Sequence, residues 1–538
     1  MLNFFKKIFK RESTNEQPTD KNESFFLNYS DIKKLDFKYA VKRVLNQGKG
    51  DLLFEPFNYC DVEWMIANRE KEFKQMLFKE YQVAKPIIFD MPKKPFAYRP
   101  ISYLQPLDSI LYQTLVDQTI KYTHINFSKQ VYSNIINKIT KPEVFDNPVS
   151  HWLKMRDSLR YQHAKGANFY FFCDISGYFE NIKIQSLLKR MKHYVGRNEI
   201  AYLKLLSEVL KTWQYADAQG IVQPHNASSI LGKIYLAQVD SAFRFLGKNY
   251  HRYVDEFHIM AKSEEDLREI SIQLSRELRQ LGLNLNISKS KSFKNDEILV
   301  ELDKDKDFFD SVKYTREILK DFELSNVILT EKFEEILLDI KLGRDLDSRA
   351  FRYIIRKWQL DGNPKAINSC LEIFVKYVHL TVDITLYLRR FINEQPYEQL
   401  IFQTIFDFLN SAENIYPWQQ VWFLALLFEN KNQIVIDSQF LWDIVHDQNQ
   451  DELSIALAYL LLAKNLESHE LFLIENTYYN TSSTLIKRAI LFCMSKFTKS
   501  YKKTFYEEKD NDDLLIKFTK FFLRETDFNI DKMSILNF

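Results

Sequence analysis

The stretch FYFFCDISGYFENI, residues 169–182, decides the fold that the sequence predicts. Apolar and aromatic residues of strand type lead into Asp174, and Ile175, Ser176 and Gly177 follow as a turn. A carboxylate at the end of a buried strand is costly unless a partner offsets its charge. That partner is either a metal ion or the amide groups of a following helix that the aspartate caps. This segment alone leaves both interpretations open.

A second acidic pair lies in HRYVDEFHIMAKS, residues 251–263. Apolar, strand-like stretches flank Asp255 and Glu256, so both carboxylates are predicted at the tip of a hairpin. A solvated turn is the simpler explanation, because Asp is common in turns. Taken together with Asp174, the pair instead favours one shared site. Phosphoryl transfer with two metal ions needs carboxylates from separate elements around ions about 3.5–4 Å apart.

The composition restricts the architecture but not the partner. The chain has 538 residues, of which 46% are hydrophobic and 15% aromatic, enough for about three domains of about 150 residues each. With only 11 Gly and 13 Pro, helix is expected to predominate. The net charge of +2 neither requires nor excludes nucleic acid, because 74 basic residues can still line one groove.

Cysteine usage and hydropathy predict a cytoplasmic protein. The four cysteines form no C-x-x-C pair, which argues against both a disulfide scaffold and a zinc site. No apolar run is long enough to span a bilayer. The start, MLNFFKKIFKRE, lacks the apolar stretch and cleavage site of a secretory signal. We expect a short amphipathic helix there, docked on the protein or lying on a membrane surface.

The pattern of apolar residues divides the chain into three parts. Residues 1–24 are an N-terminal segment with a polar link, and residues 25–305 mix helical stretches, such as 106–122, with short strands. Residues 306–538 have helical periodicity almost throughout, and 370–391 is expected to be one helix. Helix starts about 20–45 residues apart predict an all-α, HEAT-like helical-repeat domain. An irregular helical bundle is the alternative.

Further segments surround the acidic residues. Between them, a loop that starts at Gly220 leads into a predicted helix beginning near Ser228. After them, a helix ends at a turn containing Gly282, and an extended run carries Lys289. Upstream, the sequence KKPFAYRPISYLQPLDSILYQTLV occupies residues 93–116.

In this order, the segments resemble the conserved motifs of reverse transcriptases. Residues 169–182 are similar to motif A, residues 253–256 (YVDE) to motif C, and residues 281–291 to motif D. Motif C usually reads Y-x-D-D. The resemblance covers about residues 30–300 and implies an α+β fold with right-hand fingers and palm.

The remaining two motifs support the same resemblance. Residues 93–116 are similar to the fingers region, with Arg99 in a Y-R-P-I context. Residues 220–240 resemble motif B, whose family pattern is G-[LI]-P-Q-G-x-x-x-S-x-x-L-x-N-x-Y-L. The matching positions are Gly220, Gln223, Ser228, Leu231, Tyr235 and Leu236.

Four positions depart from the family pattern. Motif B has Val222 instead of Pro, Pro224 instead of Gly and Lys233 instead of Asn, and motif C has Glu256 instead of its second Asp. Glu256 retains the acidic group, and an Asp-Glu pair also occurs in the corresponding motif of family A DNA polymerases. Two interpretations follow: an active polymerase, or a degenerate palm that serves as a nucleic-acid-binding or scaffolding subunit beside an active polymerase.

The resemblance implies a metal site and catalytic residues. Asp174, Asp255 and Glu256 would be catalytic and, with the backbone carbonyl of Ile175, would hold two Mg²⁺ or Mn²⁺ ions. The predicted reaction is RNA-directed DNA synthesis, with dNTPs as substrates and nucleic acid as template and product.

Six residues are implied in nucleotide binding. Lys94 and Arg99 would hold the triphosphate, because cations offset its charge. Phe179 would exclude a ribose 2′-hydroxyl, Gln223 and Ser228 would line the nascent base pair, and Lys289 would protonate the leaving group or contact the primer. The structural alternatives are core packing for Phe179, and salt bridges or solvation for the cations.

The predicted helical domain indicates which group of reverse transcriptases the chain resembles. A palm followed by helical repeats is similar to the bacterial abortive-infection group, which makes DNA in antiphage defence. The resemblance leaves open whether synthesis is protein-primed, template-independent or directed by a noncoding RNA. It also leaves open a homo-oligomer or a complex with a second defence protein. For priming from protein, Tyr29 and Tyr39 are the candidate hydroxyls.

Overall fold

The computed structural model describes most of the chain. The described ranges are 28–48, 52–94, 97–121, 127–195, 199–246, 250–304, 306–432, 436–464, 471–496, 505–507 and 512–536. Within these ranges, no helix combines the length and the apolarity needed to cross a membrane. The predicted amphipathic start and polar link, residues 1–24, lie outside the described residues.

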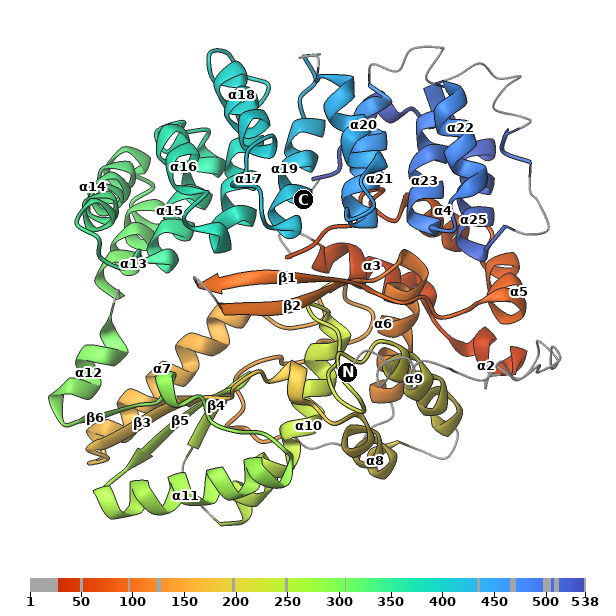
Figure 1. Cartoon of the computed structure of the whole chain (residues 1–538). Helices are drawn as coiled ribbons and strands as arrows, with labels where there is room; N and C mark the ends of the chain where they lie inside the picture. The colour runs from red at the N-terminus through yellow and green to blue at the C-terminus, as the bar shows by residue number, and fades with distance from the viewer. Residues whose placement is uncertain are drawn as a thin grey trace, which may run out of the picture.

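A four-stranded antiparallel sheet forms the centre of the predicted palm (Figure 1). Its strands are β3 (Phe169–Asp174), β4 (Tyr250–Tyr253), β5 (Glu256–Ala261) and β6 (Lys291–Lys294), in the order β4-β5-β3-β6. The strands predicted at residues 169–173 and 257–261 are confirmed. Because β3 pairs with both β5 and β6, the strand that ends in Asp174 lies inside the sheet.

Helices cover both faces of this sheet, because both faces carry apolar side chains. On one face, β3 and β5 share a core with α10 (Asn226–Phe245) and α11 (Glu264–Gln280). On the other, Tyr170 and Met260 pack in a smaller core with α7 (Pro148–Ala164) and α12 (Asp296–Asp303). The rest of the first core comes from α8 (Ile184–Tyr194) and α9 (Ile200–Thr212), among other elements.

Helix α10 begins at Asn226, two residues before the predicted start near Ser228. The difference is due to His225, whose Nδ1 accepts a hydrogen bond from the Ala227 N–H at 3.1 Å and so caps the helix. Burial lowers the pKa of His225 to about 3, so the imidazole is neutral and its Nδ1 can accept. A histidine is not among the usual capping residues, and the sequence therefore did not signal this start.

The predicted fingers lie between the sheet and the C-terminal helices (Figure 1). They comprise the hairpin of β1 (Ile87–Lys94) and β2 (Ala97–Tyr103), and helix α6 (Pro106–Lys121), which confirms the helix predicted at 106–122. The remaining helices are α2 (Tyr29–Lys34), α3 (Phe37–Gln47), α4 (Cys60–Asn68) and α5 (Glu70–Glu80). A buried ion pair between Arg43 and Asp117, 2.5 Å, ties α3 to α6.

From residue 306 onward the described chain is helical, and its helices stand in one row (Figure 1). They are α13 (Lys306–Lys313), α14 (Phe322–Lys341), α15 (Ser348–Asp361), α16 (Ile367–Ile373), α17 (Thr381–Arg389), α18 (Tyr397–Leu409), α19 (Pro417–Phe428), α20 (Ser438–His446), α21 (Glu452–Leu462), α22 (Leu471–Asn480), α23 (Thr484–Cys493) and α25 (Leu514–Glu525). The prediction of an α+β part followed by an all-helical part is confirmed at this level.

One prediction in this region is wrong, because residues 370–391 do not form a single helix. They comprise the end of α16, a 3₁₀ turn at Val378–Leu380 and α17. Gln419 Nε2 donates to the Phe374 carbonyl and to Thr381 Oγ1, both at 3.1 Å. This side chain on α19 satisfies a carbonyl that an unbroken helix would bond internally. Apolar periodicity continues through the break, so the pattern could not reveal it.

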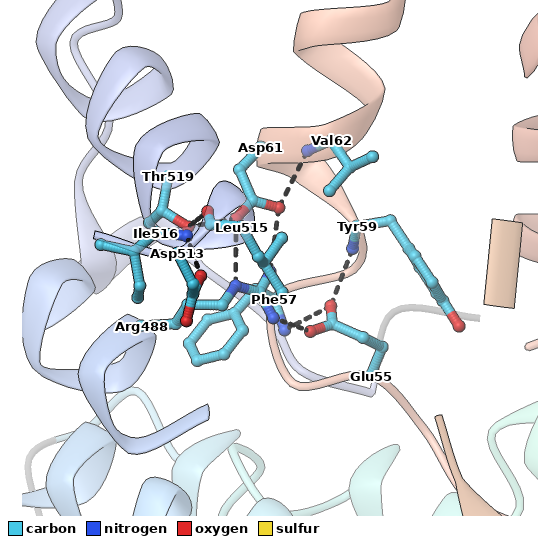
Figure 2. A network of polar contacts seen from close by, with 10 residues as sticks. All are labelled: Glu55, Phe57, Tyr59, Asp61, Val62, Arg488, Asp513, Leu515, Ile516 and Thr519. Atoms are coloured by element: carbon cyan, nitrogen blue, oxygen red, sulfur yellow. Dashed lines mark hydrogen bonds and ion pairs between the residues drawn. The ribbon is translucent and has the colours of Figure 1, made fainter. Parts of the chain in front are cut away.

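A buried charge cluster joins the start of the described chain to the last helices (Figure 2). Arg488 of α23 donates to Glu55 at 2.7 Å and to Asp61 at 2.9 Å, and all three side chains are buried. Thr519 of α25 donates its hydroxyl to Asp61 at 2.6 Å. Leu53, Phe54 and Phe57 also pack in the core of the C-terminal helices. The cores on either side of the predicted boundary at residue 305 therefore interlock.

Candidate active site

Strand pairing brings the acidic residues of two distant segments together. In the β3–β5 pair, Asp174 stands directly opposite Glu256, so both side chains leave the sheet on the same face. The Ile175 N–H donates to the Asp255 carbonyl at 3.3 Å, which joins the end of β3 to the hairpin tip. The carboxyl groups of Asp174 and Asp255 are close enough for a hydrogen bond and for charge repulsion.

Burial and mutual repulsion raise the pKa of both acids of the hairpin. For Asp255 the larger cause is burial, followed by the charge of Asp174. For Glu256 the causes are burial and then the charges of Asp255 and Asp174, while Lys289 acts in the opposite direction. A raised pKa means that the ionised cluster is unfavourable without a cation to offset its charge.

Lys289 provides one such cation. Its Nζ donates to Asp174 Oδ2 at 2.7 Å, and Asp174 is almost completely buried. The Asn286 N–H donates to the Asp174 carbonyl at 2.7 Å, which holds the 3₁₀ turn Ile287–Lys289 against β3. The sequence predicted Lys289 beside the leaving group or the primer, and the structure places it on the Asp174 carboxylate.

The donor set at this point fits a divalent metal ion. Carboxylate oxygens and a backbone carbonyl are the ligands that Mg²⁺ and Mn²⁺ prefer, and a cation would relieve the repulsion between Asp174 and Asp255. In the part of the chain that the structure describes, no three His, Cys, Asp or Glu side chains are already gathered to hold an ion. Asp174 is bonded to Lys289, and Glu256 lies 3.9 Å from His258.

A cavity of about 360 Å³ contains four of the predicted nucleotide-binding residues. Arg99, Phe179, Gln223 and Ser228 all line it, although they come from three separate stretches of the chain. Its other lining residues are Gln47, Leu52, Pro224, His225, Asn226 and Ser229. The volume lies within the range of about 300–1,000 Å³ that is usual for small-molecule sites.

Phe179 packs closely against α10 beside this cavity. A Cβ atom at Gly232 would lie 3.2 Å from the Phe179 ring and 3.2 Å from the Tyr178 ring. The Tyr178 hydroxyl donates to the Gly232 carbonyl at 2.5 Å. The glycine thus permits the close approach that sets the position of Phe179, whose half-buried ring also lines the cavity.

Gln223 and Ser228 are held mainly by contacts within the protein. The Ser228 hydroxyl bonds to the Tyr112 hydroxyl at 2.9 Å and is buried, so it is committed to α6. The Gln223 carbonyl accepts a hydrogen bond from the Ser102 N–H at 2.7 Å, which ties the loop before α10 to β2. Of the two residues, Gln223 and Ser228, only Gln223 therefore offers a polar side chain for a contact with a base.

The structure points to Lys93, which the sequence did not predict, in addition to the predicted Lys94. Lys94 is the last residue of β1, and its side chain lies outside the described part of the chain. Burial and the charge of Arg99 lower the pKa of Lys93, and Asp174 and Lys289 also act on it, so Lys93 lies among the charges of the site. The β1–β2 register is irregular between Pro92 and Lys94. Such an irregularity breaks the strand alternation that could have selected Lys93.

The two candidate priming tyrosines do not line the cavity. Tyr29 of α2 packs against Phe78, with ring centroids 5.8 Å apart, and lies 4.7 Å from the Lys33 ammonium. Tyr39 is half-buried in α3. In Figure 1, α2 lies on the side of the molecule away from β3 and β5.

The segment that contains this site matches a known protein family. Residues 91–312 match the family model described as "Reverse transcriptase (RNA-dependent DNA polymerase)". Both acidic segments, the β1–β2 hairpin and α10 lie in or overlap this range. The chain therefore contains a reverse-transcriptase domain, and its enzyme class is RNA-directed DNA polymerase. Nucleotides and nucleic acid are the substrates of this class.

Solved structures of telomerase show a distant likeness. The enzyme of Candida tropicalis, in complex with a fragment of telomeric RNA, has 13% identity and a TM-score of 0.29 over 62% of this chain and 67% of that chain. The corresponding complex from Candida albicans has 14% identity and a TM-score of 0.29 over 63% and 66%. Apo telomerase from Candida tropicalis has 12% identity and a TM-score of 0.31 over 74% and 69%. No curated protein matches this sequence.

Proposed function

We propose that this chain synthesises DNA from dNTPs at the site of Asp174, Asp255 and Glu256, with two Mg²⁺ or Mn²⁺ ions. The observation that carries the proposal is the pairing of Asp174 opposite Glu256, with the backbone of Asp255 bonded to Ile175 beside them. Two distant stretches of the chain thus supply acidic groups to one point. This is the arrangement that nucleotidyl transfer with two metal ions requires.

The acidic residues have distinct roles in this proposal. Asp174 and Asp255 are the principal metal ligands, and Glu256 and the carbonyl of Ile175 are auxiliary ones. When bound, the divalent ions would lower the pKa of the primer 3′-hydroxyl and offset the negative charge of the leaving pyrophosphate. Lys289, which lies on Asp174, gives a proton to that leaving group or contacts the primer in this proposal.

The cavity of about 360 Å³ holds the incoming nucleotide. Arg99 binds the triphosphate with its fixed set of N–H donors, and Lys93, or Lys94, adds a second positive charge. Phe179 excludes a ribose 2′-hydroxyl and so favours dNTPs. Gln223 contacts the nascent base pair, while Ser228 holds the wall of the cavity through Tyr112.

The biological role that we propose is antiphage defence in the cytoplasm, as in the abortive-infection group. Support comes from the row of helices after residue 306, which we assign as a HEAT-like repeat domain. It takes the place of the ribonuclease H domain or the basic maturase region of other reverse transcriptases. The same proposal includes an assembly, either a homo-oligomer or a complex with a second defence protein. It also includes a noncoding RNA as template and the hydroxyl of Tyr29 or Tyr39 as primer.

The test is incorporation of labelled dNTPs by the purified full-length protein with Mg²⁺. The Asp255→Asn variant keeps the shape of the side chain and is expected to lose about 100-fold or more of the activity, as when one charge-stabilising group is removed from other enzymes. Asp217→Asn, at an exposed position, is the matched control and should keep the wild-type rate. Equal rates for wild type and Asp255→Asn would refute the assignment of this site.

The alternative is a degenerate palm that binds nucleic acid or acts as a scaffold without catalysis. Glu256 in place of the usual second Asp favours it, and the Asp174 carboxylate is already bonded to Lys289. Protection against phage by cells that carry Asp174→Ala, together with no incorporation by the wild-type protein, would select this alternative. Copurifying nucleic acid that stays attached after denaturation would instead support priming from a protein hydroxyl.

A further inference from the structure

The residue before Asp255 has a strained backbone. Val254 has a φ of +56°, which lies in the left-handed region. A β-branched residue is a genuine outlier there. Such a conformation persists only where the surrounding structure holds it in place. Because Val254 precedes Asp255, its conformation sets the direction in which the Asp255 side chain leaves the hairpin.

Both polar groups of Val254 are bound by side chains. The Val254 N–H donates to Ser133 Oγ at 2.6 Å, and Arg252 Nη1 donates to the Val254 carbonyl at 2.6 Å. Ser133 and Arg252 are 3% and 1% exposed, so water does not compete strongly for either bond. Ser133 lies in the loop that precedes α7, far from the hairpin in the sequence.

Ser133 is in turn fixed by Lys233 of α10. The Lys233 ammonium donates to the carbonyls of Ser133 and Asn134, at 3.0 and 2.8 Å. It is buried and lies 4.7 Å from the centre of the Phe127 ring. Lys233 stands where the reverse-transcriptase pattern has Asn, so this departure provides a long side chain whose amine donates to the loop.

Arg252 is fixed by Asp240, also on α10. Asp240 accepts from Arg252 Nε at 2.9 Å and Nη2 at 2.5 Å, and from the Tyr250 hydroxyl at 2.8 Å. The backbone of Arg252 is bonded to Gln130 and Tyr132, each at 2.9 Å. The loop that contains Ser133 and the strand that contains Arg252 are thus joined to each other and to the same helix.

We propose that Ser133 and Arg252 are positioning residues that hold Val254 in its left-handed conformation and so aim the Asp255 carboxylate at Asp174. Lys233 and Asp240 keep the two in place. This inference rests on the proposed function, because the Asp255 carboxylate matters only if it binds ions. Without the bond from Ser133, the Val254 peptide is free to relax, and the Asp255 side chain turns away.

The expected effect is on kcat rather than on KM. A displacement of about 1 Å at the reacting centre lowers rates by about 100-fold, so Ser133→Ala is expected to lower kcat by about 10- to 100-fold. The nucleotide cavity contains neither Ser133 nor Val254, so KM for dNTP should stay within about twofold. A purely structural role for Ser133 would lower the amount of folded protein and leave kcat per folded molecule unchanged.

Matched variants separate these explanations. Ser271→Ala removes a hydroxyl that bonds to its own helix and should behave as wild type, and Ser133→Thr retains the hydroxyl and should restore kcat. Val254→Gly takes φ +56° without strain, so Ser133→Ala should lower kcat less in that background. An unchanged kcat in Ser133→Ala, or an equal loss in the wild-type and the Val254→Gly backgrounds, would overturn the proposal.

A second readout does not depend on polymerisation. Electron paramagnetic resonance measures the binding of Mn²⁺ to the full-length protein. The affinity should weaken by about tenfold in Ser133→Ala, which corresponds to about 1.4 kcal/mol. Asp255→Asn should weaken it as well. If wild type binds Mn²⁺ but makes no DNA, the proposed function fails while this comparison still decides the positioning role. Equal binding by wild type and Ser133→Ala would refute that role.

Discussion

Replacing Arg488 by Met is expected to loosen the joint between the fingers and the C-terminal helices. The Arg488 guanidinium binds Asp61 and Glu55 (Figure 2), and all three side chains are 0–1% exposed. Without the cation, two carboxylates stay buried without their main partner. Breaking a buried ion pair in this way costs about 3–5 kcal/mol. Burial already raises the pKa of Glu55, and Arg488 is the main group that opposes the shift.

The loss is measurable as a shift of the unfolding transition. At about 2–4 °C per kcal/mol for units of 150–250 residues, the melting temperature of Arg488→Met should fall by about 6–20 °C. Circular dichroism during heating measures this shift. Arg352→Met is the matched control, because it removes a partly exposed pair with Asp383, and such pairs are worth about 0–1 kcal/mol.

Two results would refute this reasoning. The first is a melting temperature of Arg488→Met close to that of Arg352→Met. The second concerns the triple variant Glu55→Gln, Asp61→Asn, Arg488→Met, which leaves no buried charge in the cluster and should recover much of the loss. A triple variant no more stable than Arg488→Met would show that packing of the Arg488 side chain, and not charge, makes the joint.

Two further predictions concern the cavity and a buried acid. Phe179→Ala should raise the use of rNTPs relative to dNTPs by about 10-fold or more, because a missing group in a pocket changes discrimination by about 10- to 200-fold. The rates with each nucleotide measure this, and Phe245→Ala, at an exposed position of α10, should leave the ratio unchanged. Burial raises the pKa of Asp108 to about 7. Its neutral form is therefore favoured in the folded state, and its contribution to stability falls as the pH rises from about 4 to 7, by about 4 kcal/mol. Asp108→Asn should thus melt higher than wild type at pH 8, and the difference should shrink toward pH 4; parallel curves would contradict this.

The local patterns that predicted the palm depend on neighbouring residues in the chain. Strand β3 could be predicted because its aromatic run ends at a charged residue, and the turn of Asp255 because apolar stretches flank it. Arg99, Phe179 and Gln223 were implied by the resemblance to three separate motifs, and the structure places them around one cavity. Their roles in binding a nucleotide remain predictions.

The errors also have physical causes. Lys93 was not predicted, because the irregular strand register at Pro92–Lys94 cannot be read from alternation, and the role of Lys94 stays a prediction. The start of α10 was placed late, because a buried neutral histidine acts as its cap. At the break in residues 370–391, a carbonyl accepts a hydrogen bond from Gln419, a residue of another helix, and no local pattern contains that contact.

The resemblance to reverse-transcriptase motifs implied the palm, whereas the sequence by itself determined which residues carry charge at the ends of apolar runs. It did so because hydrophobic periodicity and turn residues act over a few neighbouring positions. Only the tertiary structure decided that Ser133 and Arg252 bind the two polar groups of Val254, and that Arg488 joins residues 55–61 to the last helices. These contacts join residues far apart in the chain, and their partners become identifiable only once the packed core brings the segments together.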